Sequence, residues 1–104
     1  LMIIDCTEKA NQPMFNENKY IAVLFNGEIY NHKFLRNHLE KKDIFFKTSH
    51  SDTEVVLKGL ESEGLDFIKK LEGQVAITFI DKNKKKIYLI RDRVGQKPLF
   101  ITKE

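Results

Sequence analysis

The residues best suited to catalysis stand at the end of an apolar run, at Asn26-Gly27-Glu28. The run itself, Tyr20–Phe25, is rich in strand-forming side chains, and Asn-Gly is the strongest short signal for a tight turn. Such a turn would present a backbone N–H, a side-chain amide and a carboxylate at one point, as stabilisation of an anionic transition state requires. Read alone, the same residues also fit an ordinary hairpin tip. The apolar pair after them, Ile29-Tyr30, favours a turn that joins a buried strand to a helix.

Two further acids, Asp52 and Glu54, stand at an expected helix start. Ser51 and Glu54 have the spacing of a capping box, in which a hydroxyl and a carboxylate satisfy the first backbone N–H groups of a helix. Acids in a first helical turn also offset the positive end of the helix dipole, which accounts for both residues without any function. The pattern therefore predicts a helix here and leaves the role of the acids open.

Other reactive side chains offer weaker signals. The single cysteine, Cys6, has no activating partner nearby in the sequence, so we do not assign it as a nucleophile. It also excludes an internal disulfide, and this favours a reducing compartment. The three histidines share no metal-ligand spacing, and we expect no metal site. The segment Arg91–Leu99 fits a charged turn between strands.

Composition indicates one globular domain. The chain has 104 residues, of which 41% are hydrophobic, enough for a single core. No apolar run approaches the roughly 18 residues that a membrane span needs. The net charge of +3 invites a nucleic-acid function, but the densest lysine run, Lys82–Lys86, lies between two apolar strands and fits a solvated turn. We therefore expect neither a membrane nor a nucleic acid as a partner.

The periodicity predicts an α+β fold with a largely antiparallel sheet, because hairpins stand beside grouped helices. Residues 6–18 read as a loop, and Tyr20–Phe25 reads as a strand covered on both faces. We expect strands at residues 1–5, 20–25, 44–47, 74–81, 86–91 and 98–102. We expect helical segments at residues 32–41 and 51–63, and around 67–71. Their buried positions would be Phe34, Leu35, His38, Leu39, Val56, Leu57, Leu60, Phe67, Ile68 and Leu71.

Taken together, these segments resemble the class II glutamine amidotransferase domain of glutamine-hydrolysing asparagine synthetases. The likeness spans nearly the whole chain. The motifs together are more specific for the family than any one of them alone. The related sugar-phosphate and purine-pathway amidotransferases share the Asn-Gly and Asp-Thr-Glu motifs. The motifs that carry the resemblance are Leu1–Asp5, Asn11–Met14, Asn26–Asn31, Phe46 with Thr48, Ser51–Val55, Leu71 with Gly73, Arg91–Arg93 and Gly95–Leu99.

The resemblance implies an N-terminal-nucleophile fold, an αββα sandwich of two antiparallel sheets between helical layers. In that family a cysteine at the start of the mature chain attacks the glutamine amide, with its own α-amine as base. By similarity, Asn26 and Gly27 would form the oxyanion hole, and Glu28 and Asp52 would bind the substrate's α-ammonium group. Backbone groups near Ile3 would line the glutamine pocket. We therefore expect the carboxylates of Glu28 and Asp52 to face one pocket.

The resemblance also implies segments beyond these residues. We expect residues 1–104 to be a partial domain with both ends missing, and the parent protein to transfer glutamine nitrogen to aspartate in the cytoplasm. ATP and Mg²⁺ would act in a separate synthetase domain, and this chain would hold no cofactor. Its partners would be glutamine, the remaining segments and, through the uncovered strands, a second copy. The alternative is a non-catalytic amidotransferase-like binding module.

The 104 residues alone are expected to release no ammonia from glutamine. Leu1 occupies the first position, and Cys6 falls in the expected loop, so neither the nucleophile nor its base is present. A coupled ammonia assay on the purified chain checks this. Ammonia release that depends on Asn26 or Glu28 would contradict it.

Overall fold

The sheet and its helices follow the order of the sequence. The computed structural model describes residues 12–94 and 100–103, so the expected first strand and Cys6 lie outside the described residues. The elements are β1 (Met14–Phe15), β2 (Ile21–Ile29), α1 (His32–Glu40), α2 (Asp52–Glu63), the 3₁₀ helix η2 (Gly64–Lys70), β3 (Gly73–Asp81), β4 (Lys86–Val94) and β5 (Phe100–Lys103).

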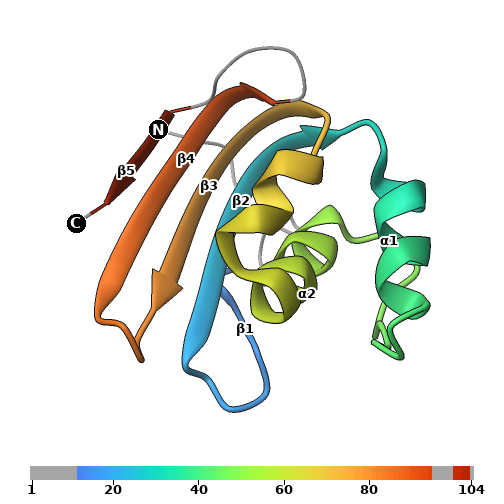
Figure 1. The fold of residues 1–104 in the computed structure, drawn as a ribbon, viewed down its shortest axis with the longest axis horizontal. Helices are drawn as coiled ribbons and strands as arrows, with labels where there is room; N and C mark the ends of the chain where they lie inside the picture. Colours follow the sequence, from blue (N-terminus) through green and yellow to red (C-terminus); the bar gives the residue numbers. More distant parts are fainter. Residues whose placement is uncertain (1–11, 95–99, 104) are drawn as a thin grey trace.

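The five strands form one antiparallel sheet in the order β1-β2-β3-β4-β5. The helical elements between β2 and β3 all lie against one face of this sheet (Figure 1). Strands of an antiparallel sheet alternate their side chains between the two faces. In β3 the alternate residues Val75, Ile77 and Phe79 are accordingly buried toward the helices. The predicted α+β architecture with a largely antiparallel sheet is confirmed.

The core lies between the sheet and α2. This helix is buried on most of its surface, because β2 packs on one side and η2 on another. Gly59 allows η2 to pack closely on α2, since a Cβ there would lie 2.2 Å from the ring of Phe67. The buried apolar side chains of this core include Val23, Phe25, Leu35, Leu39, Val56, Leu60, Phe67, Ile68 and Leu71.

The opposite face of the sheet is open among the described residues. Leu24 on β2 and Leu89 on β4 are 39% and 38% exposed, and they lie on the same transverse row because each pairs with Thr78. The expectation that β2 is covered on both faces is therefore wrong for the part of the chain that the structure describes. The cause is topological, since every helix in that part lies on a single side.

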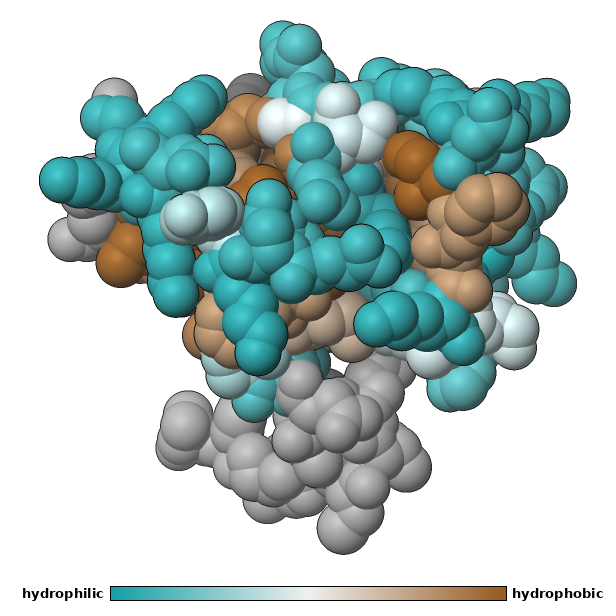
Figure 2. Space-filling view, turned by 90° about the horizontal axis from the view of Figure 1, so that it is seen from below, coloured by the Kyte–Doolittle hydropathy of each residue, from teal (hydrophilic) through white to brown (hydrophobic). Residues whose placement is uncertain are grey.

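The lysine-rich turn between β3 and β4 behaves as expected. The carboxylate of Asp81 accepts a hydrogen bond from the backbone N–H of Lys84 at 3.1 Å, which closes the turn. The turn lies at the lower end of the sheet in Figure 1, and the view from below in Figure 2 is dominated by hydrophilic side chains. Brown, apolar areas are smaller and lie between them.

Among the described helices, none has the length and apolar character to cross a bilayer.

Several local expectations are wrong. Ile44–Lys47 forms no strand, and Met14–Phe15 forms a short strand inside the expected loop. Phe34 is 65% exposed, because α1 buries only Leu35 and Leu39 against the core. The stripe after Gly64 is a 3₁₀ helix, which still buries its apolar residues as expected.

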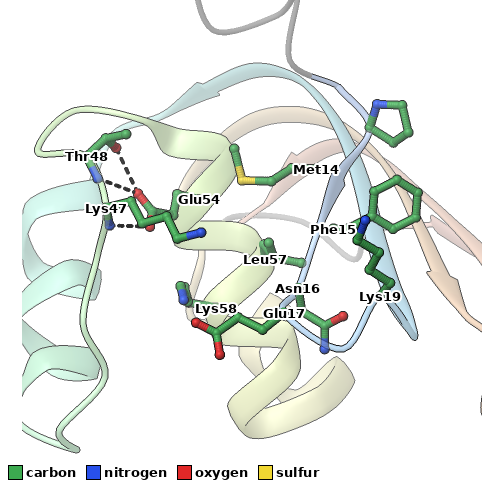
Figure 3. A pocket seen from close by; sticks show the side chains of 11 residues that line it. Met14, Phe15, Asn16, Glu17, Lys19, Lys47, Thr48, Glu54, Leu57 and Lys58 are labelled. Carbon is green, nitrogen blue, oxygen red and sulfur yellow. Dashed lines mark hydrogen bonds between the residues drawn. The ribbon is translucent and has the colours of Figure 1, made fainter.

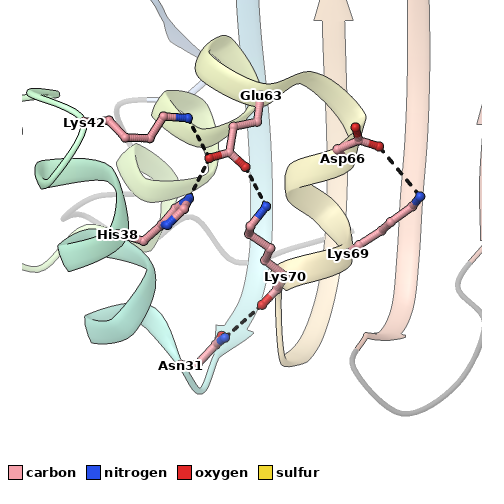
Figure 4. A network of polar contacts seen from close by, with 7 residues as sticks. All are labelled: Asn31, His38, Lys42, Glu63, Asp66, Lys69 and Lys70. Carbon is pink, nitrogen blue, oxygen red and sulfur yellow. Dashed lines mark hydrogen bonds and ion pairs between the residues drawn. The ribbon is translucent and has the colours of Figure 1, made fainter.

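An ion cluster holds α1 to the end of α2 (Figure 4). The carboxylate of Glu63, whose side chain is 12% exposed, lies 2.6 Å from Nε2 of His38 and 2.9 Å from Nζ of both Lys42 and Lys70. Burial alone would raise the pKa of Glu63, but the hydrogen bonds from Lys70, Lys42 and His38 outweigh it and lower the pKa from 4.5 to about 2. The charged carboxylate is thus the form that the fold stabilises.

Replacing Glu63 by Gln should make the free energy of unfolding less dependent on pH. Because folding lowers this pKa, the contribution of Glu63 is present above pH 4.5 and is lost as the pH falls toward 2. We expect E63Q to cost about 1–2 kcal/mol at pH 7, since its lysine partners are partly exposed and screened. The cost should vanish near pH 2. Urea unfolding across this pH range measures the difference.

The exposed Glu40 on α1 provides the matched control. E40Q removes the same charge from the same region without breaking the Glu63 cluster, so its effect should stay within about 0.5 kcal/mol. Equal costs for E40Q and E63Q at pH 7 would show that the cluster adds no stability.

Candidate functional site

Asn26, Gly27 and Glu28 lie inside β2 and not in a turn, which corrects the expectation from the Asn-Gly signal. All three are exposed. Gly27 has φ +134°, and a Cβ there would lie 2.2 Å from the backbone oxygen of Gln74 on β3. Glycine is therefore required by the close approach of the neighbouring strand and by this backbone angle, and not by a change of chain direction.

The even-numbered residues of β2 direct their backbone groups to β3. Beyond the two ends of the strand, the N–H of Tyr30 donates to the oxygen of Glu72 at 2.7 Å, and the N–H of Lys82 donates to the oxygen of Tyr20 at 2.8 Å. Both pairs continue the β2–β3 register. In an antiparallel ladder the hydrogen-bonded pairs alternate along the strand, so the odd-numbered residues of β2 direct their backbone groups to the other edge.

Three partners along that other edge confirm the alternation. The oxygen of Ile21 accepts from the backbone N–H of Asn16 at 2.9 Å. The N–H of Phe25 donates to the side-chain oxygen of Gln12 at 2.6 Å, and the N–H of Ile29 donates to the Asp52 carboxylate at 3.3 Å. By the same alternation the Gly27 N–H lies on this edge, between the Gln12 and Asp52 contacts.

Asp52 reaches β2 because α2 begins beside it. The hydroxyl of Ser51 accepts from the backbone N–H of Glu54 at 3.1 Å, so the predicted capping residue and helix start are confirmed. Asp52 is the first residue of the helix and is half-buried. Its contact with Ile29 brings it next to the backbone of the segment that carries Glu28. The structure thereby joins two sequence-distant parts of the predicted site at one sheet edge.

Glu54 has a role that the sequence analysis missed. Its buried carboxylate accepts from the backbone N–H groups of Lys47 and Thr48 at 2.6 and 2.9 Å, and from the Thr48 hydroxyl at 2.8 Å (Figure 3). The guanidinium of Arg36 donates to the oxygen of Thr48 at 2.7 Å and lies 4.3 Å from the centre of the Phe46 ring. These contacts fix the loop that leads into α2 and thus the place of Asp52.

Asn31 fixes the exit of β2. It is the N-cap residue of α1, but its side chain makes no capping hydrogen bond. Instead its amide donates to the oxygen of Lys70 at 2.8 Å and accepts from the N–H of Glu72 at 3.0 Å. Asn31 therefore ties the end of β2 to the segment that enters β3.

A cavity described in the structure lies away from the predicted site. It has a volume of about 510 Å³ and lies between β1 and α2 (Figure 3). Its lining contains none of the predicted residues Asn26, Gly27, Glu28 and Asp52. Ile3, the fifth of them, lies outside the described residues. In residues 12–94 and 100–103, no cluster of three or more His, Cys, Asp or Glu side chains could hold a metal ion.

Comparison with known proteins defines the class of protein to which this fold belongs. The family model of the glutamine amidotransferase domain matches residues 1–104, and the chain belongs to this family. Its fold is of the N-terminal-nucleophile type, as two solved structures support. One is glutamine phosphoribosylpyrophosphate amidotransferase from Bacillus subtilis (28% identity, TM-score 0.61, 78% of this chain and 20% of that one). The other, described as the allosteric regulatory enzyme of purine biosynthesis, gives 25% identity and a TM-score of 0.62 over 88% of this chain and 23% of that one.

Curated relatives point to a particular branch. Asparagine synthetase [glutamine-hydrolyzing] 2 of Bacillus subtilis is 44% identical over 98% of this chain, and the namesake of Arabidopsis thaliana is 44% identical over 97%. An amidase, chyE of Penicillium rubens, is 36% identical over 98% of the chain. The chain spans only 13%, 17% and 15% of these three relatives. The predicted resemblance to the synthetase branch is confirmed.

Replacing Gly27 by Ala should disrupt the β2–β3 pairing. The added Cβ would meet a backbone oxygen that cannot move without shifting β3, and it would also disfavour the positive φ. We expect a cost above about 2 kcal/mol, measured by chemical denaturation.

Gly64 offers the control, because it also has a positive φ, of 69°, but an added Cβ there meets no atom within 4 Å. G64A should show the conformational cost alone, about 1–2 kcal/mol. If G27A costs no more than G64A, the close approach of β3 is not what requires glycine at position 27.

Proposed function

We propose that this chain supplies the oxyanion-stabilising and glutamine-binding part of the glutaminase site of an asparagine synthetase. The observation that carries the proposal is the edge of β2, where the Gly27 N–H lies between the Phe25 and Ile29 contacts. Asn26 and Glu28 flank this N–H on the strand, and Asp52 reaches the same edge from α2. The identity to glutamine-hydrolysing asparagine synthetases supports the choice of branch.

The proposed chemistry begins with attack of a cysteine thiolate on the side-chain amide carbon of glutamine. A carbon–sulfur bond forms, and the carbonyl π electrons move onto oxygen, which becomes an oxyanion. The Asn26 amide and the Gly27 N–H would donate hydrogen bonds to this oxygen. Collapse of the intermediate expels the nitrogen, which takes a proton and leaves as ammonia. Water then hydrolyses the thioester. Donors held on a strand need no reorganisation as the charge develops.

Glu28 and Asp52 would bind the α-ammonium group of glutamine. Hydrogen bonds between ionised partners are stronger than neutral ones, and two carboxylates match one ammonium with several donors. Glu28 is exposed and Asp52 half-buried, so a ligand can reach the first while the second is held by the Ile29 N–H. Backbone groups near Ile3 would complete the pocket.

The rest of the reaction belongs to the parent protein. The attacking cysteine would come from a segment beyond these residues, and aspartate, the substrate that accepts the nitrogen, would bind with ATP and Mg²⁺ in a separate synthetase domain. Ammonia would pass from the glutaminase site to that domain, in the cytoplasm. Glutamine and these other segments are the proposed partners, and the 104 residues alone would not catalyse the reaction.

Substitutions at the sheet edge should separate catalysis from binding in the full-length protein. N26A removes an oxyanion donor and should lower kcat for glutamine hydrolysis by about 100–1000-fold. D52N removes a charge partner of the α-ammonium group and should raise KM for glutamine by about 10–100-fold. Steady-state ammonia release measures both.

Asp66 on η2 serves as the control, because its side chain is 80% exposed and pairs with Lys69 at 3.7 Å. D66N should behave as the wild type. Normal kcat in N26A would refute the oxyanion assignment. Glutamine binding without any hydrolysis by the full-length wild type would instead favour the non-catalytic module.

A further inference from the structure

Gln12 bridges the two halves of the proposed site. Its side-chain oxygen accepts from the Phe25 N–H at 2.6 Å, and its side-chain nitrogen donates to the Phe25 oxygen at 2.8 Å. The same nitrogen lies 3.4 Å from the Thr53 hydroxyl. Phe25 directly precedes Asn26, and Thr53 comes directly after Asp52. We propose that Gln12 is a positioning residue that holds the oxyanion strand and the start of α2 in their working geometry.

The register explains why a side chain takes this place. β1 pairs Met14 with Val23 and Phe15 with Ala22. Continued by two residues, the same register sets Gln12 opposite Phe25. The strand β1 begins only at Met14, two residues after Gln12. A glutamine amide carries the same donor and acceptor as a peptide group. The Gln12 side chain therefore makes the hydrogen bonds to Phe25 that the backbone of a longer β1 would make.

The Gln12 contact restrains the proposed oxyanion segment along its free edge. Phe25, Gly27 and Ile29 present their backbone N–H groups in succession along the edge, the first held by Gln12 and the last by Asp52. Gly27, between them, has no side chain to restrain it. Loss of the Gln12 contact would free a point that helps to orient the Gly27 N–H. On the proposed function, this lowers the stabilisation of the transition state more than the binding of glutamine.

A matched side chain lies at the other end of β1. The Asn16 oxygen accepts from the Ile21 N–H at 3.0 Å, and its nitrogen donates to Glu61 at 3.0 Å. Asn16 thus bridges β2 and α2 in the same manner as Gln12, but at the start of the strand and near the end of the helix. A general effect of weakening the β1 segment should appear in both variants, whereas a positioning effect should appear only at Gln12.

The test compares Gln12→Met with Asn16→Leu in the full-length protein. Both substitutions keep the approximate side-chain size and remove the amide. We expect Q12M to lower kcat for glutamine hydrolysis by about 10-fold or more with KM changed less than about 3-fold, since small misplacement of reacting groups is costly. N16L should keep kcat within about 2-fold of the wild type. Equal losses in the two variants, or no loss in Q12M, would overturn the inference.

A second variant, Gln12→Glu, and a second measurement, amide hydrogen exchange, test the positioning role further. Gln12→Glu keeps the acceptor for the Phe25 N–H but loses the donor to the Phe25 oxygen, so its kcat should also fall, while ammonium-driven asparagine formation stays unchanged in all variants. Amide hydrogen exchange of residues 26–29 should be faster in Q12M than in N16L. If the wild type hydrolyses no glutamine, the proposed function fails, and this exchange still decides: equal rates in Q12M and N16L overturn the positioning role.

Discussion

The backbone of β2 must satisfy hydrogen-bonding groups on two edges, and the rest of the structure is arranged around this requirement. Its even-numbered residues pair with β3, which fixes the register of the sheet. On its other edge Val23 pairs with β1, Phe25 contacts the Gln12 amide and Ile29 contacts the Asp52 carboxylate. Because an unpaired buried backbone group is costly, each of these partners constrains where its own element can lie. The candidate site is the stretch of this edge that no strand covers among the described residues.

The helical layer acts on the site through the start of α2. Glu54 and Arg36 both hydrogen-bond to Thr48 in the preceding loop. These contacts fix the start of α2 and therefore the position of Asp52 beside β2. The Glu63 cluster fastens the other end of the same helix to α1. A single helix held at both ends can place a carboxylate with the precision that a flexible loop lacks.

Much of this architecture could be predicted from the sequence. The apolar runs of β2 and β3, the Ser51 cap and the Gly64 stop each carry a local signal that the structure keeps. The Asn-Gly signal misled, because Gly27 is needed for a close approach between strands, which depends on the register and not on neighbouring residues. The strand predicted at residues 44–47 is wrong for a similar reason. Phe46 packs against the guanidinium of Arg36, and no described strand lies beside this segment to pair with it. Gln12 gave no local signal, as its partner Phe25 is set by the pairing of β1. The site roles of Asn26, Gly27, Glu28 and Asp52 stay predictions.

The order of the strands has a consequence for how the chain folds. Among the described strands every sheet neighbour is also the next strand along the chain, so most pairings close through short connections. The pairing of β2 with β3 is the exception, because residues 30–72 lie between them. Closing a loop of this length costs about 3 kcal/mol of chain entropy beyond the constant term. Non-local pairings of this kind slow folding. We therefore expect helix formation within residues 30–72 to shorten that loop and speed the pairing of β2 with β3.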